Sequence, residues 1–209
     1  MSDRYYPIFV KGRNLHGLVA GGGTVGVRKA EALLASGARV TVVSPQGTDR
    51  LIDLSERNLL QWVREPYNDG FLQGVRLAIG ATGDRSVNER VYRDACRRGI
   101  PVNIVDDPEL CTFIVPAVVT KGPLCVAVCT GGAAPALARK IRDDLEAALP
   151  DEYEAMIDEL GLLRPAIRRL TAGSKERFWQ TIASIDPNDY RGEPEALRRH
   201  IRAELERAA

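Results

Sequence analysis

Residues 19–45 have the sequence VAGGGTVGVRKAEALLASGARVTVVSP, and this stretch decides the fold. An apolar strand runs into glycines, a helix follows from Thr24, and a second strand rich in β-branched residues begins at Arg39. Gly37 suits the end of the helix, because glycine readily adopts the left-handed conformation that closes helices. A strand, a glycine turn, a helix and a strand in this order predict the first unit of a parallel α/β sheet.

The glycines of this stretch fit the spacing G-x-G-x-x-G at Gly21, Gly23 and Gly26. Gly21 would allow a tight turn, Gly23 would let a pyrophosphate approach the backbone, and Gly26 would let the helix lie close to the strand. The first N–H groups of the helix would then bind the phosphates. This context favours a dinucleotide site over a glycine turn with a purely structural role.

The second strand ends at Ser44, where many dinucleotide-binding proteins have an acid that binds the ribose hydroxyls. The missing acid argues against FAD and against most NAD dehydrogenases of this architecture. Arg50 could meet the 2′-phosphate of NADP, or it could be a solvated loop residue. Backbone groups around Pro45 and Gln46 could still bind the adenosine end of NAD.

The alternation of strands and helices continues for about 115 residues. Further strands are predicted within 59–65, 75–82 and 100–107, and a helix over 85–99. We therefore expect a Rossmann-like, doubly wound parallel sheet in residues 1–115.

The pattern changes after this domain. Two strands within 113–130 surround a Lys-Gly-Pro turn, and a helix with apolar Leu137, Ile141, Leu145 and Ala148 on one face follows within 131–150. A hairpin and one helix are too small to fold alone, so this segment must pack on the first domain or on a second copy. We expect a small α+β dimerisation segment at 116–149 and a helical C-terminal domain at 150–209.

Polar residues follow two of the predicted strands. Thr82, Asp84 and Asn88 follow one, and Asn103, Asp106 and Asp107 end the other. The carboxyl ends of parallel strands face the ligand crevice of an open sheet. The alternative for the Asp-Asp-Pro run is turn and cap chemistry, but two polar strand ends at one crevice favour a site.

Composition excludes several classes of function. The 29 basic and 28 acidic residues give a net charge of +1, which does not suggest a nucleic-acid binder. No apolar run is long enough to span a membrane, and the N-terminus does not have the pattern of a secretory signal. The cysteines form no C-x-x-C pair and the chain has 2 histidines, so we expect no metal site and mostly buried thiols in a reducing cytosol: Cys96, Cys111, Cys125 and Cys129.

Four stretches together resemble precorrin-2 dehydrogenase, which is the N-terminal module of bacterial siroheme synthases and also a free-standing enzyme. They are residues 19–45, ATGDRSVNERV at 81–91, VNIVDDPELCTFIVPAVVTKGPLCVAVCTGGAAPALARKIRDDLEAALP at 102–150, and RFW at 177–179. No methyltransferase segment follows, so the free-standing form is expected. The sequence departs from the commoner family pattern at Gly83, where an aspartate is usual, and at His16, where an apolar residue is usual.

The resemblance implies an NAD-dependent oxidation of precorrin-2 to sirohydrochlorin by a cytoplasmic homodimer that exchanges the hairpin and helix. The family also lacks the acid after its second strand, so NAD is expected rather than NADP. Asp106 matches the family's essential aspartate and is the candidate general base. The expected cofactor-binding residues are Gly21, Gly22, Gly23, Thr24, Val25, Ser44, Pro45, Gln46, Thr82, Gly83, Asp84, Asn88 and Asn103.

A tetrapyrrole rich in carboxylates needs cations and helix N-termini around a wide cleft. The start of the helix at Gly131 and Gly132 is a candidate anion-binding edge, with nearby Lys121, Arg139 and Arg142. These charges could instead belong to an ordinary surface. Thr130 matches a serine that is phosphorylated in one branch of the family.

Two other functions stay open. Some family members also insert iron into the product, and Asp106 could serve in such a ferrochelatase. A nucleotide-sensing module without chemistry would explain the glycines, but it would not explain the cluster from Asn103 to Asp106.

Overall fold

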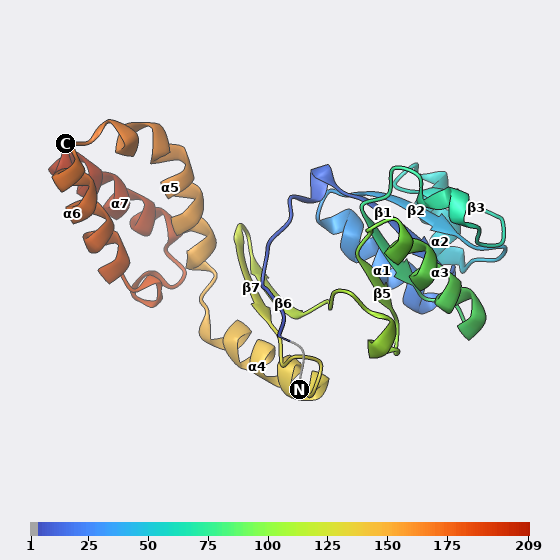
Figure 1. The fold of residues 1–209 in the computed structure, drawn as a ribbon. Coiled ribbons are helices and arrows are strands. Elements are labelled where there is room, and N and C mark those ends of the chain that lie inside the picture. Colours follow the sequence, from blue (N-terminus) through green and yellow to red (C-terminus); the bar gives the residue numbers. More distant parts are fainter. Residues whose placement is uncertain (1–3) are drawn as a thin grey trace. The chain divides into compact units, whose positions relative to one another are not determined.

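The computed structural model describes residues 4–209, which divide between Val115 and Pro116 into two compact units (Figure 1). We call them the first and the second unit and describe each by itself. In the part of the chain that the structure describes, no helix has both the length and the apolar character needed to cross a membrane.

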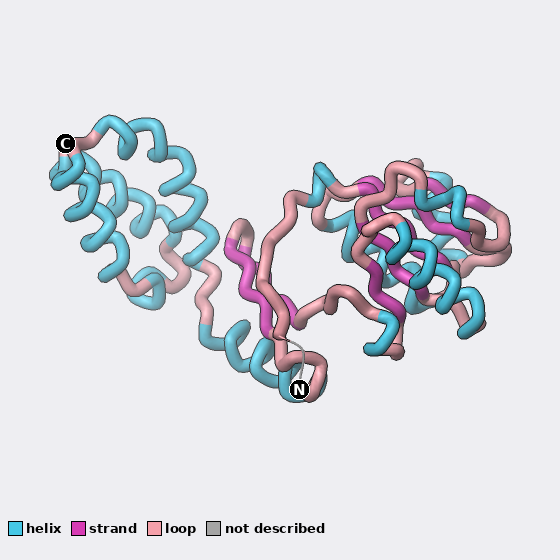
Figure 2. The backbone as a smooth tube through the Cα atoms, viewed as in Figure 1, coloured by secondary structure: helices cyan, strands magenta, loops and turns pink. Residues whose placement is uncertain are grey.

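The first unit is built on a parallel sheet with the strand order β3-β2-β1-β4-β5, drawn in magenta in Figure 2. Its strands are β1 (His16–Ala20), β2 (Arg39–Val43), β3 (Gln61–Val63), β4 (Leu77–Gly80) and β5 (Val102–Ile104). β1 pairs with β2 on one side and with β4 on the other, so the strand order reverses there. The carboxyl ends of β1 and β4 meet at this reversal, which is where open α/β sheets bind ligands.

Both faces of this sheet are covered within the first unit. The covering elements are α1 (Thr24–Ala35), α2 (Asp49–Glu56), α3 (Arg85–Arg97) and the 3-10 turn Asp69–Leu72. Val19 and Val42 pack in one core with residues of α1 and α2, whereas Leu18 and Ala78 pack in another with residues of α3. Successive strand residues point to opposite faces, so these two cores confirm the doubly wound fold.

Some predicted boundaries differ from the observed ones. Helix α2 was not predicted, because a single short helix with Leu51 and Leu54 buried has too little periodicity to be recognised. Strands β3 and β5 are shorter than the apolar runs that contain them. Helix α1 ends at Ala35, and Gly37 follows with a φ of +82°, as expected for a glycine that closes a helix.

His16, the unusual polar residue of β1, is half-buried and fully bonded. Its Nδ1 accepts from Arg39 Nη2 at 2.9 Å, and its Nε2 lies 3.0 Å from Thr41 Oγ1. Arginine can only donate, so Nδ1 carries no proton and Nε2–H is the donor to Thr41. Burial, followed by the nearby Arg39 charge, lowers the pKa of the His16 imidazole.

The second unit begins with the antiparallel hairpin of β6 (Ala117–Lys121) and β7 (Leu124–Val128), in which Val119 pairs with Val126. Helix α4 (Pro135–Ala148) packs on both strands. Three further helices surround a core that includes Met156, Phe178 and Ile201: α5 (Glu152–Arg169), α6 (Ala172–Ser184) and α7 (Pro194–Ala208). The 3-10 turns Gly12–Asn14 and Pro108–Leu110 belong to the first unit, and the turn Pro187–Tyr190 belongs to the second.

The apolar face of α4 is partly uncovered, since Leu137 is 49% and Ile141 36% exposed, so the expected packing of this face on another surface stays a prediction. One expectation about burial is wrong. The thiols are not mostly buried: Cys111 is half-buried, and the exposed ones are Cys96, Cys125 and Cys129. The division of the second unit into a dimerisation segment and a helical domain stays a prediction.

Candidate active site

Close contacts require glycine at three positions of the loop between β1 and α1: Gly21, Gly22 and Gly26. Gly21 has a φ of +123°, and a Cβ there would lie 2.3 Å from the carbonyl oxygen of Ala81. A Cβ at Gly26 would lie 2.1 Å from the carbonyl oxygen of Gly21, so only glycine lets α1 approach the loop this closely. A Cβ at Gly23 would meet no atom within 4 Å, which leaves open space in front of the backbone.

Helix α1 points its N-terminus at this open space. Its N-cap is Gly23, which has no side chain to bind the first N–H groups, and Thr24 and Val25 are exposed. The N–H groups of the first helical turn have no partner within the helix and carry a partial positive charge. The loop therefore presents donors to an anion such as a phosphate.

The end of β2 borders the same loop. Ser44 is buried at 6% exposure, while Pro45 and Gln46 are exposed. Gly22 is packed so tightly against this segment that a Cβ would lie 2.3 Å from Ser44 Oγ. The structure thus places Ser44 beneath the glycine loop, with little surface left for a ligand.

The guanidinium of Arg50 already forms two ion pairs. Its Nε donates to Glu31 at 2.7 Å and its Nη1 to Asp53 at 2.7 Å. The hydrogen bond to Glu31 raises the pKa of the guanidinium. A 2′-phosphate would have to compete with both carboxylates, which argues against Arg50 as an NADP determinant.

The loop after β4 is held by Asn88. This buried amide donates to the Thr82 carbonyl at 3.1 Å and accepts from the Thr82 N–H at 3.2 Å. Asp84 caps α3 by accepting from the Ser86 hydroxyl and N–H, at 2.7 and 2.8 Å, and these bonds lower the pKa of its carboxyl. Asn88 and Asp84 therefore shape the loop, and Gly83 is exposed at its tip.

The loop after β5 places two aspartates differently. Asp106 is exposed and has a φ of +60°, a strained conformation for a residue other than glycine, and such strain is concentrated at functional sites. Asp107 is half-buried and lies 3.5 Å from Arg85 Nη2. Asn103 does not extend past the strand end, because its amide donates to the Phe113 carbonyl at 3.0 Å and so braces the returning chain.

Lys29 is a residue of this site that sequence reasoning missed. It is half-buried on α1, and burial, followed by the charge of Arg28, lowers the pKa of its ammonium. The carboxylate of Asp106 acts in the opposite direction, so the two charges are within electrostatic reach of each other. The sequence signal for Lys29 is its position three residues after Gly26, because this spacing puts it on the side of the helix that faces the strand.

The predicted substrate-binding residues lie in the second unit, and several are bonded there. Lys121 pairs with Asp151 at 2.5 Å, and Arg142 pairs with Asp143 at 2.6 Å. Thr130 Oγ1 accepts from the N–H of Ala134 at 3.3 Å. Of the three predicted cations, Arg139 is the exposed one for which no ion pair is seen in the described part of the chain.

The two glycines precede helix α4. Helix α4 begins at Pro135, so Gly131 and Gly132 do not form its first turn. They make a left-handed turn before it, with φ values of +63° and +79°. The exposed backbone of this turn precedes the helix start instead of belonging to it.

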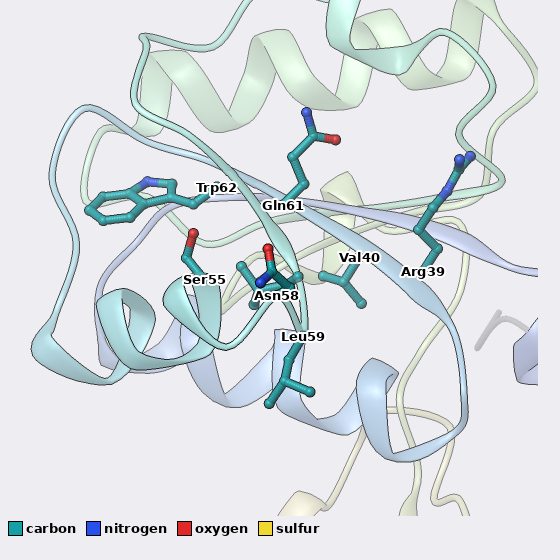
Figure 3. Close-up of a pocket in the computed structure, with 8 residues that line it drawn as sticks. Arg39, Val40, Ser55, Asn58, Leu59, Gln61 and Trp62 are labelled. Carbon is teal, nitrogen blue, oxygen red and sulfur yellow. The ribbon is translucent and has the colours of Figure 1, made fainter.

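A hollow of about 440 Å³ lies elsewhere in the first unit (Figure 3). Figure 3 shows Trp62 at one end of it and Arg39 at the other. Arg39 and Gln61 are the first residues of their strands, so this hollow reaches the amino edge of the sheet, opposite the glycine loop. Across residues 4–209, no cluster of three or more His, Cys, Asp or Glu side chains could hold a metal ion.

Comparison with known proteins agrees with this geometry. Residues 8–117 match the model of a family described as putative NAD(P)-binding, and residues 121–148 match the central part of sirohaem biosynthesis proteins. The siroheme synthase of Chromobacterium violaceum is 42% identical over 85% of this chain and 38% of its own length. That of Methylococcus capsulatus is 41% identical over 84% of this chain and 38% of its own.

A solved structure extends the likeness over the whole fold. SirC, a precorrin-2 dehydrogenase, matches 97% of this chain and 100% of its own with a TM-score of 0.77 and 26% identity. The chain belongs to the precorrin-2 dehydrogenase and siroheme synthase family. The chain spans 38% of the length of each of these two siroheme synthases.

The family likeness extends over both units. One family model covers most of the first unit, and the other covers the segment from Lys121 to Ala148 in the second unit. The structure brings together Gly21 to Val25, Ser44 to Gln46, Thr82 to Asp84 and Asp106 at one edge of the first sheet. Asn88 and Asn103 brace this edge from behind.

Proposed function

We propose that this chain oxidises precorrin-2 to sirohydrochlorin with NAD as the hydride acceptor. The observation that carries the proposal is the likeness to a precorrin-2 dehydrogenase over 97% of this chain and 100% of that one. The glycine loop and Asp106 at one edge of the sheet supply the two functions that this reaction needs, a nucleotide seat and a proton acceptor.

The glycine loop fits NAD. Open space in front of Gly23 and the free N–H groups of Thr24 and Val25 would hold the pyrophosphate. Pro45 and Gln46, exposed at the end of β2, would border the adenosine, and the Thr82–Asp84 loop would border the nicotinamide half. NAD, when bound, supplies the hydride acceptor.

Asp106 would accept the proton. The oxidation removes a hydride and a proton from the macrocycle, so NAD⁺ becomes NADH and the proton goes to a base. An exposed carboxylate at the strand end is available for this, whereas Asp107 is paired with Arg85.

We further propose that the turn at Gly131 and Gly132, together with Thr130, Arg139 and Arg142, binds carboxylates of the substrate. Arg139 is exposed, and the turn presents backbone without side chains. Lys121 is the weakest candidate of the set, because Asp151 already neutralises it and raises the pKa of its ammonium.

The proposal includes a homodimer in the cytoplasm that prefers NAD to NADP. The uncovered apolar face of α4 supports the dimer, and four free cysteines agree with a reducing compartment. The ion pairs of Arg50 support NAD. A higher kcat/KM with NADP, lost in Arg50→Ala, would contradict the cofactor preference.

Anaerobic incubation of the full chain with precorrin-2 and NAD tests the activity. We expect the spectrum of sirohydrochlorin to appear together with NADH, and neither to appear without NAD. Binding of NAD without any change in precorrin-2 would instead support a nucleotide-sensing module. Addition of Fe²⁺ to the finished reaction tests iron insertion, which would appear as a second spectral change faster than in enzyme-free controls.

A further inference from the structure

Ser44 has bonds that a ligand-binding residue at this position would not have. The indole Nε1 of Trp62 donates to both Ser44 Oγ and the Ser44 carbonyl oxygen, each at 3.1 Å. The Ser44 N–H donates to the Val63 carbonyl at 3.1 Å. The residue in the place of the ribose-binding acid is therefore turned inward, toward β3.

The segment 44–48 is also fastened to the glycine loop. The Thr48 N–H donates to the Gly22 carbonyl at 3.1 Å. A Cβ at Gly22 would lie 2.3 Å from both Ser44 Oγ and the Gln46 carbonyl oxygen, so the two loops are in direct contact. A shift of Ser44 must therefore shift the backbone at Gly22, next to the space expected for the pyrophosphate.

Trp62 holds this segment from the other side. A Cβ at Gly47 would lie 2.8 Å from Cζ2 of Trp62, so the ring supports the segment at a second point. The ring packs against the core that contains Leu51 and Leu54. The guanidinium of Arg64 lies 4.2 Å from the ring centroid, a cation–π contact that helps to fix the indole.

We propose that Trp62 is a positioning residue of the cofactor site, whose indole N–H fixes Ser44 and segment 44–48 against the glycine loop. In this arrangement the neutral hydrogen-bonded pair of Trp62 and Ser44 occupies the position at which other dinucleotide-binding proteins have a carboxylate. Trp62 acts through Ser44 and Gly22 without touching the nucleotide. The inference rests on the proposed NAD-dependent function and names a determinant of its cofactor affinity.

Calorimetric NAD binding to the full chain tests this role with Trp62→Phe, which keeps an aromatic ring and removes the N–H. We expect the Kd for NAD to rise about three- to tenfold, the effect of one net hydrogen bond. With precorrin-2 as substrate, KM for NAD should rise by a similar factor, while kcat at saturating NAD stays unchanged. Ser44→Ala removes one of two acceptors and should give a smaller rise.

Leu54→Ala is the matched control, because Leu54 is 2% exposed in the same core but is not in segment 44–48. It should lower the melting temperature and leave the NAD Kd, measured well below that temperature, unchanged. The inference is overturned if Trp62→Phe binds NAD as tightly as the wild type, or if Leu54→Ala weakens NAD equally. Failure of the wild type to bind NAD would contradict the proposed function as well.

Discussion

The two sheets of this molecule bury their surfaces in different ways. The five-stranded sheet of the first unit has α1 and α2 on one face and α3 on the other, so its central strand residues are fully buried. The hairpin of the second unit packs on α4 with one face, while Val118 and Cys125 are exposed on the other. Both faces of the first sheet are covered within its own unit, whereas one face of the hairpin is exposed.

The difference shows which parts of the site one chain can build alone. The glycine loop, segment 44–48 and Asp106 depend on contacts within the first unit. The turn at Gly131 and Gly132 follows a hairpin that leaves apolar surface uncovered. We therefore expect cofactor binding to be a property of the single chain, and substrate binding to depend on what covers the hairpin and α4.

The largest effect is expected from Asp106→Asn, which keeps the shape of the side chain and removes its basicity. General-base catalysis contributes about a hundred- to ten-thousandfold, so kcat should fall by roughly that factor while NAD affinity hardly changes. Asp107→Asn is the matched control and should be mild, since Asp107 is paired with Arg85. Loss of NAD binding in Asp106→Asn would make Asp106 a positioning residue, and turnover near that of the wild type would assign proton removal to another group.

The uncovered face of α4 is tested by Leu137→Glu, which puts a charge at an exposed apolar position. If this face is the centre of a dimer interface, the dimer Kd should rise roughly thirtyfold or more, as at interface hot spots. Leu162→Glu is the control, because Leu162 is exposed on α5, outside the proposed segment 116–149. A wild-type chain that is monomeric at micromolar concentration by light scattering would contradict the proposed dimer.

An ion pair with a buried carboxylate joins α5 and α7 in the helical part of the second unit, and its removal should lower stability. Glu159 is 1% exposed and accepts two bonds from Arg202, at 2.7 and 2.9 Å. Glu159→Gln should cost about 1.5–3 kcal/mol of unfolding free energy, whereas Asp158→Asn, at an exposed position, should cost little. Chemical denaturation of both variants measures the difference.

The same pair predicts a pH dependence. The hydrogen bonds from Arg202 lower the pKa of the Glu159 carboxyl in the folded chain. Its stabilisation is therefore complete above the unfolded pKa of about 4.3 and is lost as the pH falls through the folded value. Glu159→Gln should reduce the loss of stability in acid, and an unchanged acid dependence would contradict this assignment.

The smallest effect is expected at His16 in the first unit. Burial and Arg39 lower the pKa of the imidazole, so the unfolded chain takes up a proton at a higher pH than the folded chain. The first unit should therefore lose stability as the pH falls below about 6.5. His16→Val should weaken this dependence, as measured by melting temperatures between neutral pH and pH about 5.

The sequence predicted the first unit well because its signals are local. The glycine spacing and the β-branched strands specify the loop, and Gly37 closes α1 as expected. The roles of Asn88 and Asn103 were not predictable, because their bonds to the backbone of Thr82 and Phe113 depend on how the intervening loops fold. Trp62 gave no signal at all, since its contacts with Ser44 and Gly47 join residues far apart in the chain.

The second unit shows a different limit of sequence reasoning. The apolar stripe of α4 was recognised, but a stripe does not say whether its partner is in the same chain or in another. Cys125 and Cys129 were expected to be buried because cysteine usually is, yet they lie on uncovered surface. The usual burial of cysteine therefore does not predict the exposure of these two thiols.

The proposed function depends most on the coupling of macrocycle oxidation to NAD in the crevice of the first unit. Anaerobic turnover of a limiting amount of precorrin-2 by the full chain, with NADH and sirohydrochlorin quantified together, measures this directly. The account predicts one NADH for each sirohydrochlorin formed, at a rate that falls about a hundred- to ten-thousandfold in Asp106→Asn. Sirohydrochlorin formed without NADH, or NAD bound while precorrin-2 stays intact, would contradict it.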